Sequence, residues 1–182
     1  ALKKLKAFQG LTEQELAWIL YDVGNSAYTM LACSLIPIWF KSIAVGHAPG
    51  QISSDNATAY YSLAVSIVTV AVALLGPVRG ALADHKDKKR MYFTSAAALG
   101  MIFCVLTGFA WSWLLFLILF VVTKICYSAS LTIYDSMLGD ITTEDRMDEV
   151  SSNGFAWGYL GSCIPFLIAL IAYVLGPDMV GL

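Results

Sequence analysis

Polar and charged side chains inside long apolar stretches are the residues of this sequence that could do chemistry. Asp22 lies about 10 Å into the first such stretch, at ~1.5 Å per helical residue. Asn25, Ser26 and Thr29 follow it at helical spacing and form a polar stripe. Because a charge in hydrocarbon is costly, the stripe predicts a face that contacts other helices or a water-filled cavity. We expect Asp22 to bind a solute or a coupling ion there.

A second polar set lies in a later apolar stretch. Lys124 stands near its middle, and Tyr127, Ser128 and Asp135 continue along its face. Our hypothesis is that both stretches line one central cavity, with Asp22, Asp135 and Lys124 as its charged groups. A structural alternative stays open for Lys124, which could neutralise an acid and hold two helices together. For Asp135, closer to the membrane surface, a solvated structural role is favoured.

The elements that must position these residues are membrane-spanning helices. The 182-residue chain is 58% hydrophobic and 13% charged, and its mean hydropathy is +0.71. Soluble domains carry about 25% charged residues. We predict an all-α, polytopic membrane helix bundle that follows a cytoplasmic segment over residues 1–14. Five stretches have the roughly 20 apolar residues that a crossing needs, at about 15–40, 59–82, 91–110, 113–138 and 152–175.

The same residues disfavour several classes of protein. The two histidines, His47 and His85, lie in loops, and no nucleophile–base pair or metal-ligand cluster appears. We therefore predict that the chain is not an enzyme and holds no metal or cofactor. Its charges are segregated into loops, so nothing indicates a nucleic-acid partner. The four cysteines lie inside apolar stretches and are predicted to be small core residues without disulfides, at Cys33, Cys104, Cys126 and Cys163.

The basic residues predict the orientation of the helices in the bilayer. With a cytoplasmic N-terminus, nine of the eleven Lys and Arg residues fall on the inside. These nine are Lys3, Lys4, Lys6, Arg79, Lys86, Lys88, Lys89, Arg90 and Arg146. The positive-inside rule therefore predicts a multi-pass protein whose N-terminus is cytoplasmic.

The spacing of small residues predicts close contacts between helices at two places. The spacings of Gly76 with Gly80, and of Gly154, Gly158 and Gly161, are typical of close helix packing. Five helices cannot easily bury both faces, which suggests that further helices belong to the protein.

Two polar segments flank the predicted helices. The segment from Thr12 to Glu15 has a capping-box pattern, which predicts the start of the first helix. The acidic segment 139–150 is predicted to be a partly helical, solvated linker.

Three segments resemble a known family. The loop Gly80-x-x-x-Asp84-x-x-x-Lys88-Lys89-Arg90 resembles the signature loop of the major facilitator superfamily, although Asp87 stands where the usual pattern has glycine. The run from Trp18 to Tyr28 is similar to one branch, the vacuole effluxer family linked to autophagy. The run 151–161 is similar to the same branch.

The resemblance implies a secondary active transporter with two six-helix halves that rock about a central solute site. This chain would be a partial N-terminal half, and its partners would be the missing C-terminal half, the lipid bilayer and a small solute such as an amino acid. If protons drive transport, Asp22 would be the carrier. The resemblance also implies a cytoplasmic gate at Arg79, Gly80, Asp84 and Arg90, in a bacterial plasma membrane or a vacuolar membrane. For Lys88, Lys89 and Arg90, a role in orientation alone is the favoured interpretation.

Two other readings of the chain remain. A half-transporter that pairs with its own copy is disfavoured, because five spans do not match a six-helix unit. A membrane receptor or scaffold without transport would use Asp22 and Lys124 as a static ion pair. Exchanging the two charges should be tolerated by a static pair and not by a solute site.

Overall fold

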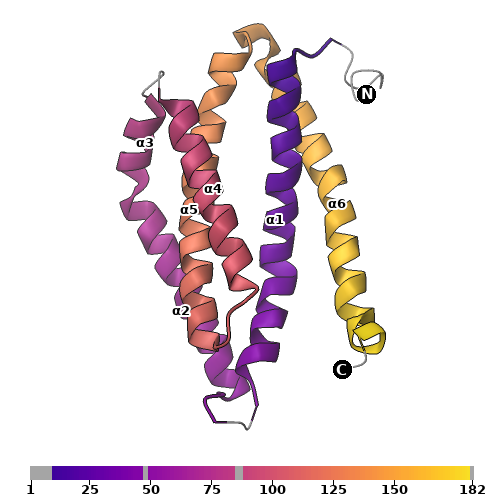
Figure 1. Ribbon diagram of the computed structural model, residues 1–182. Coiled ribbons are helices and arrows are strands. Elements are labelled where there is room, and N and C mark those ends of the chain that lie inside the picture. Colours follow the sequence, from indigo (N-terminus) through magenta and orange to yellow (C-terminus); the bar gives the residue numbers. More distant parts are fainter. Residues whose placement is uncertain (1–9, 47–48, 85–87, 181–182) are drawn as a thin grey trace. The chain divides into compact units, whose positions relative to one another are not determined.

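The computed structural model describes residues 10–46, 49–84 and 88–180, and these form helices joined by short connections (Figure 1). Within this part of the chain no strand occurs, and the all-α prediction is confirmed. Of the segment predicted at 1–14, residues 1–9 lie outside the described residues. The helices are α1 (Glu13–Ala44), α2 (Ser54–Leu74), α3 (Gly76–Asp84), α4 (Lys89–Thr107), α5 (Trp113–Ile141), the short 3-10 helix η3 (Glu144–Arg146) and α6 (Met147–Val180).

Five helical stretches are long and apolar enough to cross a membrane: α1, α2, α4, α5 and the stretch Glu144–Leu175. Large apolar side chains are exposed along them, such as Met101 and Val105 on α4 and Leu167 and Ile168 on α6. Patches of this kind are unfavourable in water but are solvated by lipid acyl chains. The chain is therefore a multi-pass membrane protein.

The stretch predicted as one span at 59–82 is divided between α2 and α3. Pro77 has no N–H to donate to the carbonyl of Ala73, so the regular hydrogen-bond ladder cannot continue there. At the junction the N–H of Leu75 donates to the carbonyls of Ala71 and Ala73. The proline thus explains why α2 ends at Leu74 and α3 begins at Gly76, with Leu75 between them.

Other helices extend beyond the predicted stretches. α1 begins at the predicted capping box, in which the N–H of Glu15 donates to Thr12 Oγ1 at 3.2 Å and the N–H of Thr12 donates to Glu15 Oε2 at 2.7 Å. The acidic segment 139–150 is partly helical, as predicted. The end of α5, η3 and the start of α6 occupy most of it, because polar residues outside the hydrocarbon can still continue a helix.

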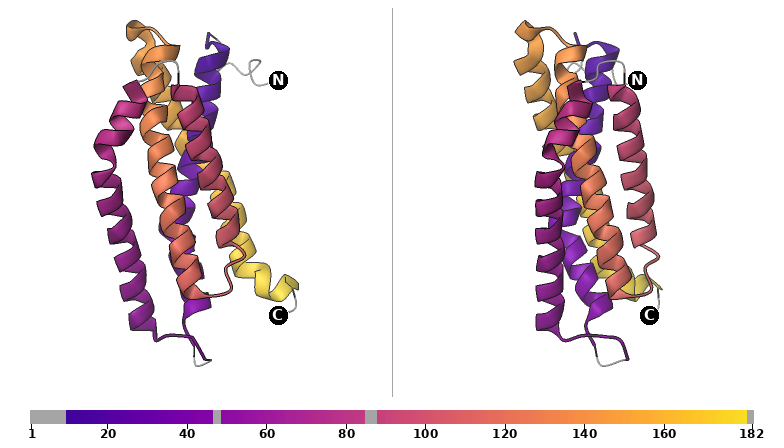
Figure 2. Two further views of the ribbon diagram at one scale, coloured as in Figure 1. Left: turned by 60° about the vertical axis from the view of Figure 1, so that its left-hand side comes forward. Right: turned by 90° about the vertical axis from the view of Figure 1, so that its left-hand side faces the viewer.

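The chain divides into two compact units. Unit 1 consists of Ala1–Ile36 and Leu138–Leu182, and unit 2 consists of Pro37–Met137. Most of α1 and all of α6 therefore belong to unit 1, whereas α2, α3, α4 and most of α5 belong to unit 2. Figure 2 shows the same helices from two further directions.

In unit 1, α1 and α6 run in the same direction and pack against each other (Figure 1). Trp18 lies against Gly154, and Val23 lies against Gly161 one to two turns further along both helices. The apolar core of this unit consists of Leu11, Ile19 and Val150, with Leu16, Trp18, Leu138 and Trp157 packed around them.

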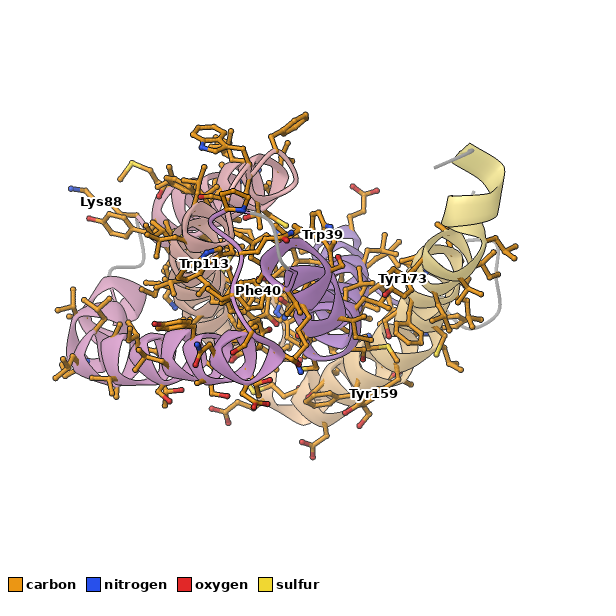
Figure 3. All side chains as sticks on the ribbon, turned by 90° about the horizontal axis from the view of Figure 1, so that it is seen from below. Trp39, Phe40, Lys88, Trp113, Tyr159 and Tyr173 are labelled. Carbon is orange, nitrogen blue, oxygen red and sulfur yellow. The ribbon has the colours of Figure 1, made fainter. Side chains whose placement is uncertain are left out.

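In unit 2, aromatic side chains hold the ends of three helices together (Figure 3). Phe40, at the end of α1, is fully buried, and its ring centroid lies 5.6 Å from those of Tyr61 on α2 and Phe116 on α5. Tyr60 stacks on Trp113 at 5.1 Å. Further along, α4 approaches α5 where Gly100 faces Cys126.

Candidate functional site

The polar stripe predicted on the first span lies on α1 in unit 1. Asp22 is 9% exposed, although it is an acid in an apolar helix. Asn25 and Ser26 are half-buried. Thr29 is exposed on this chain, and its hydroxyl donates to the carbonyl of Asn25 at 3.1 Å. The stripe therefore has a buried part, Asp22 with Asn25 and Ser26, and an exposed end at Thr29.

The buried part of the stripe faces Gly158 of α6. A Cβ atom added at Gly158 would lie 2.9 Å from both Asp22 Oδ2 and Ser26 Oγ. The amide of Asn25 is a hydrogen-bond partner of the Asp22 carboxyl. A glycine at this position lets the helix backbone approach the carboxylate and the hydroxyl directly.

The glycine face of α6 has a partner within the chain. A Cβ atom at Gly154 would lie 2.6 Å from Trp18 Cζ3, and one at Gly161 would lie 2.5 Å from Val23 Cγ1. The partner of this face is thus α1, so one of the two predicted glycine faces is covered within the chain. For the other predicted face, Gly80 has nothing within 4 Å of an added Cβ.

The sequence predicted Glu15 only as part of the capping box, but the structure gives its carboxylate further partners. The side chain of Glu15 is 1% exposed, and Oε1 accepts a hydrogen bond from Thr142 Oγ1 at 2.8 Å. The same oxygen lies 3.2 Å from Nη1 of Arg146, whose Nη2 donates to the carbonyl of Gly10. This cluster ties the start of α1 to the connection between α5 and α6. Only the capping box could be detected in the sequence, because Arg146 is distant along the chain.

The second predicted set lies on α5 in unit 2. Nζ of Lys124 lies 5.3 Å from the centroid of the Tyr127 ring, a cation–π geometry. Lys124, Tyr127 and Ser128 are half-buried, whereas Asp135 is exposed. The structure therefore brings Asp22, Asn25 and Ser26 together in unit 1 and Lys124 and Tyr127 together in unit 2.

The predicted gate loop connects α3 and α4 in unit 2. The side chains of Arg79 and Asp84, and residues 85–87, lie outside the described part of the chain. Arg90 is exposed, and Lys88 points away from the helices (Figure 3).

Lys89 differs from its basic neighbours. It is 9% exposed, and its Nζ donates to the carbonyl of Ser136 on α5 at 3.1 Å. The interpretation that these cations serve orientation alone is therefore wrong for Lys89, which joins α4 to α5. A charged loop of this kind gives no sequence signal that would single out one lysine.

Metal ligands and thiols add no further site to the described residues. Among them, no group of three or more His, Cys, Asp or Glu side chains could hold a metal ion. All four cysteines are free, but Cys33, Cys104 and Cys163 are exposed, so their prediction as core residues is wrong. A thiol is apolar enough to face lipid, and sequence hydropathy does not distinguish a lipid-facing residue from a core residue.

The chain is similar to a known protein family and to a curated relative. The family model described as Major Facilitator Superfamily matches residues 23–181. A curated relative from Bacillus subtilis (strain 168), the "Uncharacterized MFS-type transporter YxiO", is 37% identical over 167 residues, which is 90% of this chain. The chain spans 38% of that relative's length. No solved structure matches.

Proposed function

Because the chain belongs to the Major Facilitator Superfamily, we propose that it is the N-terminal part of a secondary active transporter that moves a small solute by alternating access. In this mechanism two halves of the protein rock about a solute site near the middle of the membrane. The share of the relative that the chain spans supports a second half encoded beyond these residues.

The observation that carries the proposal is the burial of Asp22. A carboxylate that is nine-tenths buried in an apolar 32-residue helix is costly to maintain. Intramembrane acids of this kind mark solute or ion routes by default. We assign Asp22, Asn25 and Ser26 to the solute or ion route, with Lys124, Tyr127 and Ser128 as its contribution from α5. Thr29 and Asp135 belong to the same proposed route.

Sequence features support three further parts of the proposal: the solute, the orientation in the membrane and the coupling ion. The similarity of the runs 18–28 and 151–161 to vacuole effluxers supports amino acids as the first solutes to test. The distribution of Lys and Arg supports a cytoplasmic N-terminus. Proton coupling would use Asp22, because a carboxyl group can carry a proton across the route. The alternative of a receptor or scaffold has no support from the family match.

Transport by the full-length protein tests this proposal. The protein would be reconstituted into liposomes, and uptake of labelled amino acids would be measured under a proton gradient. We expect Asp22→Asn to lower the uptake rate about tenfold or more. The matched control is Asp55→Asn, at an exposed acid in the first turn of α2, which should transport like the wild type.

Two results would contradict parts of the proposal. Wild-type uptake by Asp22→Asn would remove this acid from the mechanism. Absence of uptake for every amino acid, from a protein that is folded in the liposomes, would exclude amino acids as the solute.

A further inference from the structure

Within unit 1, the described residues around Asp22 supply hydrogen-bond acceptors but no cation that pairs with it. Within the described residues of unit 1, Arg146 is the one Lys or Arg, and it pairs with Glu15 and Glu149 instead. Asp22 is nine-tenths buried, and its hydrogen-bond partner is the neutral amide of Asn25. An isolated carboxylate in a low-dielectric medium is strongly unfavourable unless a cation or proton joins it.

The side-chain oxygen of Asn25, the residue that bonds to Asp22, has no partner of its own in the described part of the chain. Asn25 Oδ1 is buried and has no hydrogen-bond partner among the described residues. Because only the amide nitrogen of Asn25 can donate to Asp22, its oxygen remains as an unused acceptor. Buried acceptors without a protein partner are rare in folded proteins, and such an atom is available to a bound ion, solute or water.

Ser26 supplies a third oxygen on the same face of α1, close to Asp22 Oδ2. Asp22, Asn25 and Ser26 are spaced i, i+3 and i+4, so they share one face of α1. Asp22 Oδ2 and Ser26 Oγ lie at equal distance, 2.9 Å, from the position of a Cβ atom at Gly158. As a glycine, residue 158 places no side chain over either oxygen.

The chemistry of the three oxygens selects the ligand. A carboxylate, an amide oxygen and a hydroxyl are acceptors for a hard cation or for the N–H groups of an ammonium ion. One carboxylate neutralises one positive charge, whereas a divalent ion would keep an uncompensated charge in an apolar environment. The absence of a group of three His, Cys, Asp or Glu among the described residues also disfavours a divalent metal.

We propose that Asp22, Asn25 and Ser26 form a binding site for a small monovalent cation. The cation could come from two sources, as an inorganic ion such as Na⁺ or as the primary ammonium group of the solute. The inference builds on the proposed function in placing the site on the transport route. Cation binding itself is measured without transport, so the two can fail separately.

Thermal unfolding of the purified full-length protein tests the site. The melting temperature would be measured at constant ionic strength while N-methylglucamine chloride is replaced by NaCl, KCl or methylammonium chloride. A ligand that binds the folded state raises the melting temperature in a saturable way. We expect such a rise with NaCl if the ion is inorganic, and with methylammonium if the site takes the solute's ammonium group.

Two variants and one control make the result specific. Asn25→Ala and Ser26→Ala should each weaken the apparent cation affinity about tenfold, equivalent to ~1.4 kcal/mol. Using both protects the test if one variant fails to fold. The control is Asn153→Ala, at a half-buried residue on α6 whose amide donates to the carbonyl of Glu149, and it should retain the wild-type affinity.

The proposal would be overturned by a melting temperature that responds equally to every salt. It would also be overturned if Asn25→Ala and Ser26→Ala kept the wild-type cation response. A protein that binds the cation in this assay but transports no solute would support the site and contradict the proposed function.

Discussion

Replacing Gly161 by alanine should destabilise the protein, because α1 and α6 approach closely at this residue. The added Cβ would lie 2.5 Å from Cγ1, 3.2 Å from Cγ2 and 3.4 Å from Cβ of Val23. A β-branched side chain on a helix has one strongly preferred rotamer, so Val23 cannot turn aside at low cost. The helices must separate or the rotamer must change, and overpacking of this kind costs about 1–3 kcal/mol.

A matched substitution isolates the effect of packing from that of helix propensity. Gly24 is exposed on α1 and has nothing within 4 Å of an added Cβ. Gly24→Ala should therefore stabilise the protein by about 0.5–1 kcal/mol, because alanine is the better helix former. The free energy of unfolding would be measured by denaturant titration of the full-length protein in detergent micelles. Equal stability of Gly161→Ala and Gly24→Ala would refute the close approach of α1 and α6.

Two more predictions concern buried charged groups, and both use the same unfolding measurement. Glu15→Ala should lower the free energy of unfolding by about 1–3 kcal/mol. Glu15→Gln should lower it less, because glutamine keeps the capping box and loses only the ion pair with Arg146. Equal losses for the two variants would show that the ion pair is the whole effect. Lys89→Met should cost about 1.5–3 kcal/mol through its bond to Ser136, whereas the exposed Arg90→Met should change stability by less than about 0.5 kcal/mol. An equal response of the two basic residues would contradict the anchoring role of Lys89.

The glycine face of α6 shows that a sequence pattern can predict a close helix contact without identifying the partner helix. The spacing of Gly154, Gly158 and Gly161 predicts a close helix contact, since small residues at this interval serve that purpose. The spacing contains no information about which helix fills the contact. The structure supplies Trp18, Asp22 and Val23 of α1 as the facing residues.

Local signals were sufficient for helix type and for one helix start. Apolar length predicted the five membrane-crossing helices, and the Thr12–Glu15 pattern predicted the start of α1. Pro77 lies inside the second stretch, which hydropathy predicted as one unbroken span. Hydropathy averages over a window, so it does not register the loss of a single N–H group.

The sequence by itself determined the class of this protein and the candidate acid. A charge inside an apolar helix is anomalous wherever the helix packs, so Asp22 could be identified from its neighbours in the chain. Tertiary structure alone decided which acids and cations have partners. Glu15 meets Arg146, Lys89 meets Ser136, and Asp22 meets Gly158. These contacts join residues distant in the chain, and their energies depend on distances and burial that exist only after the helices have packed.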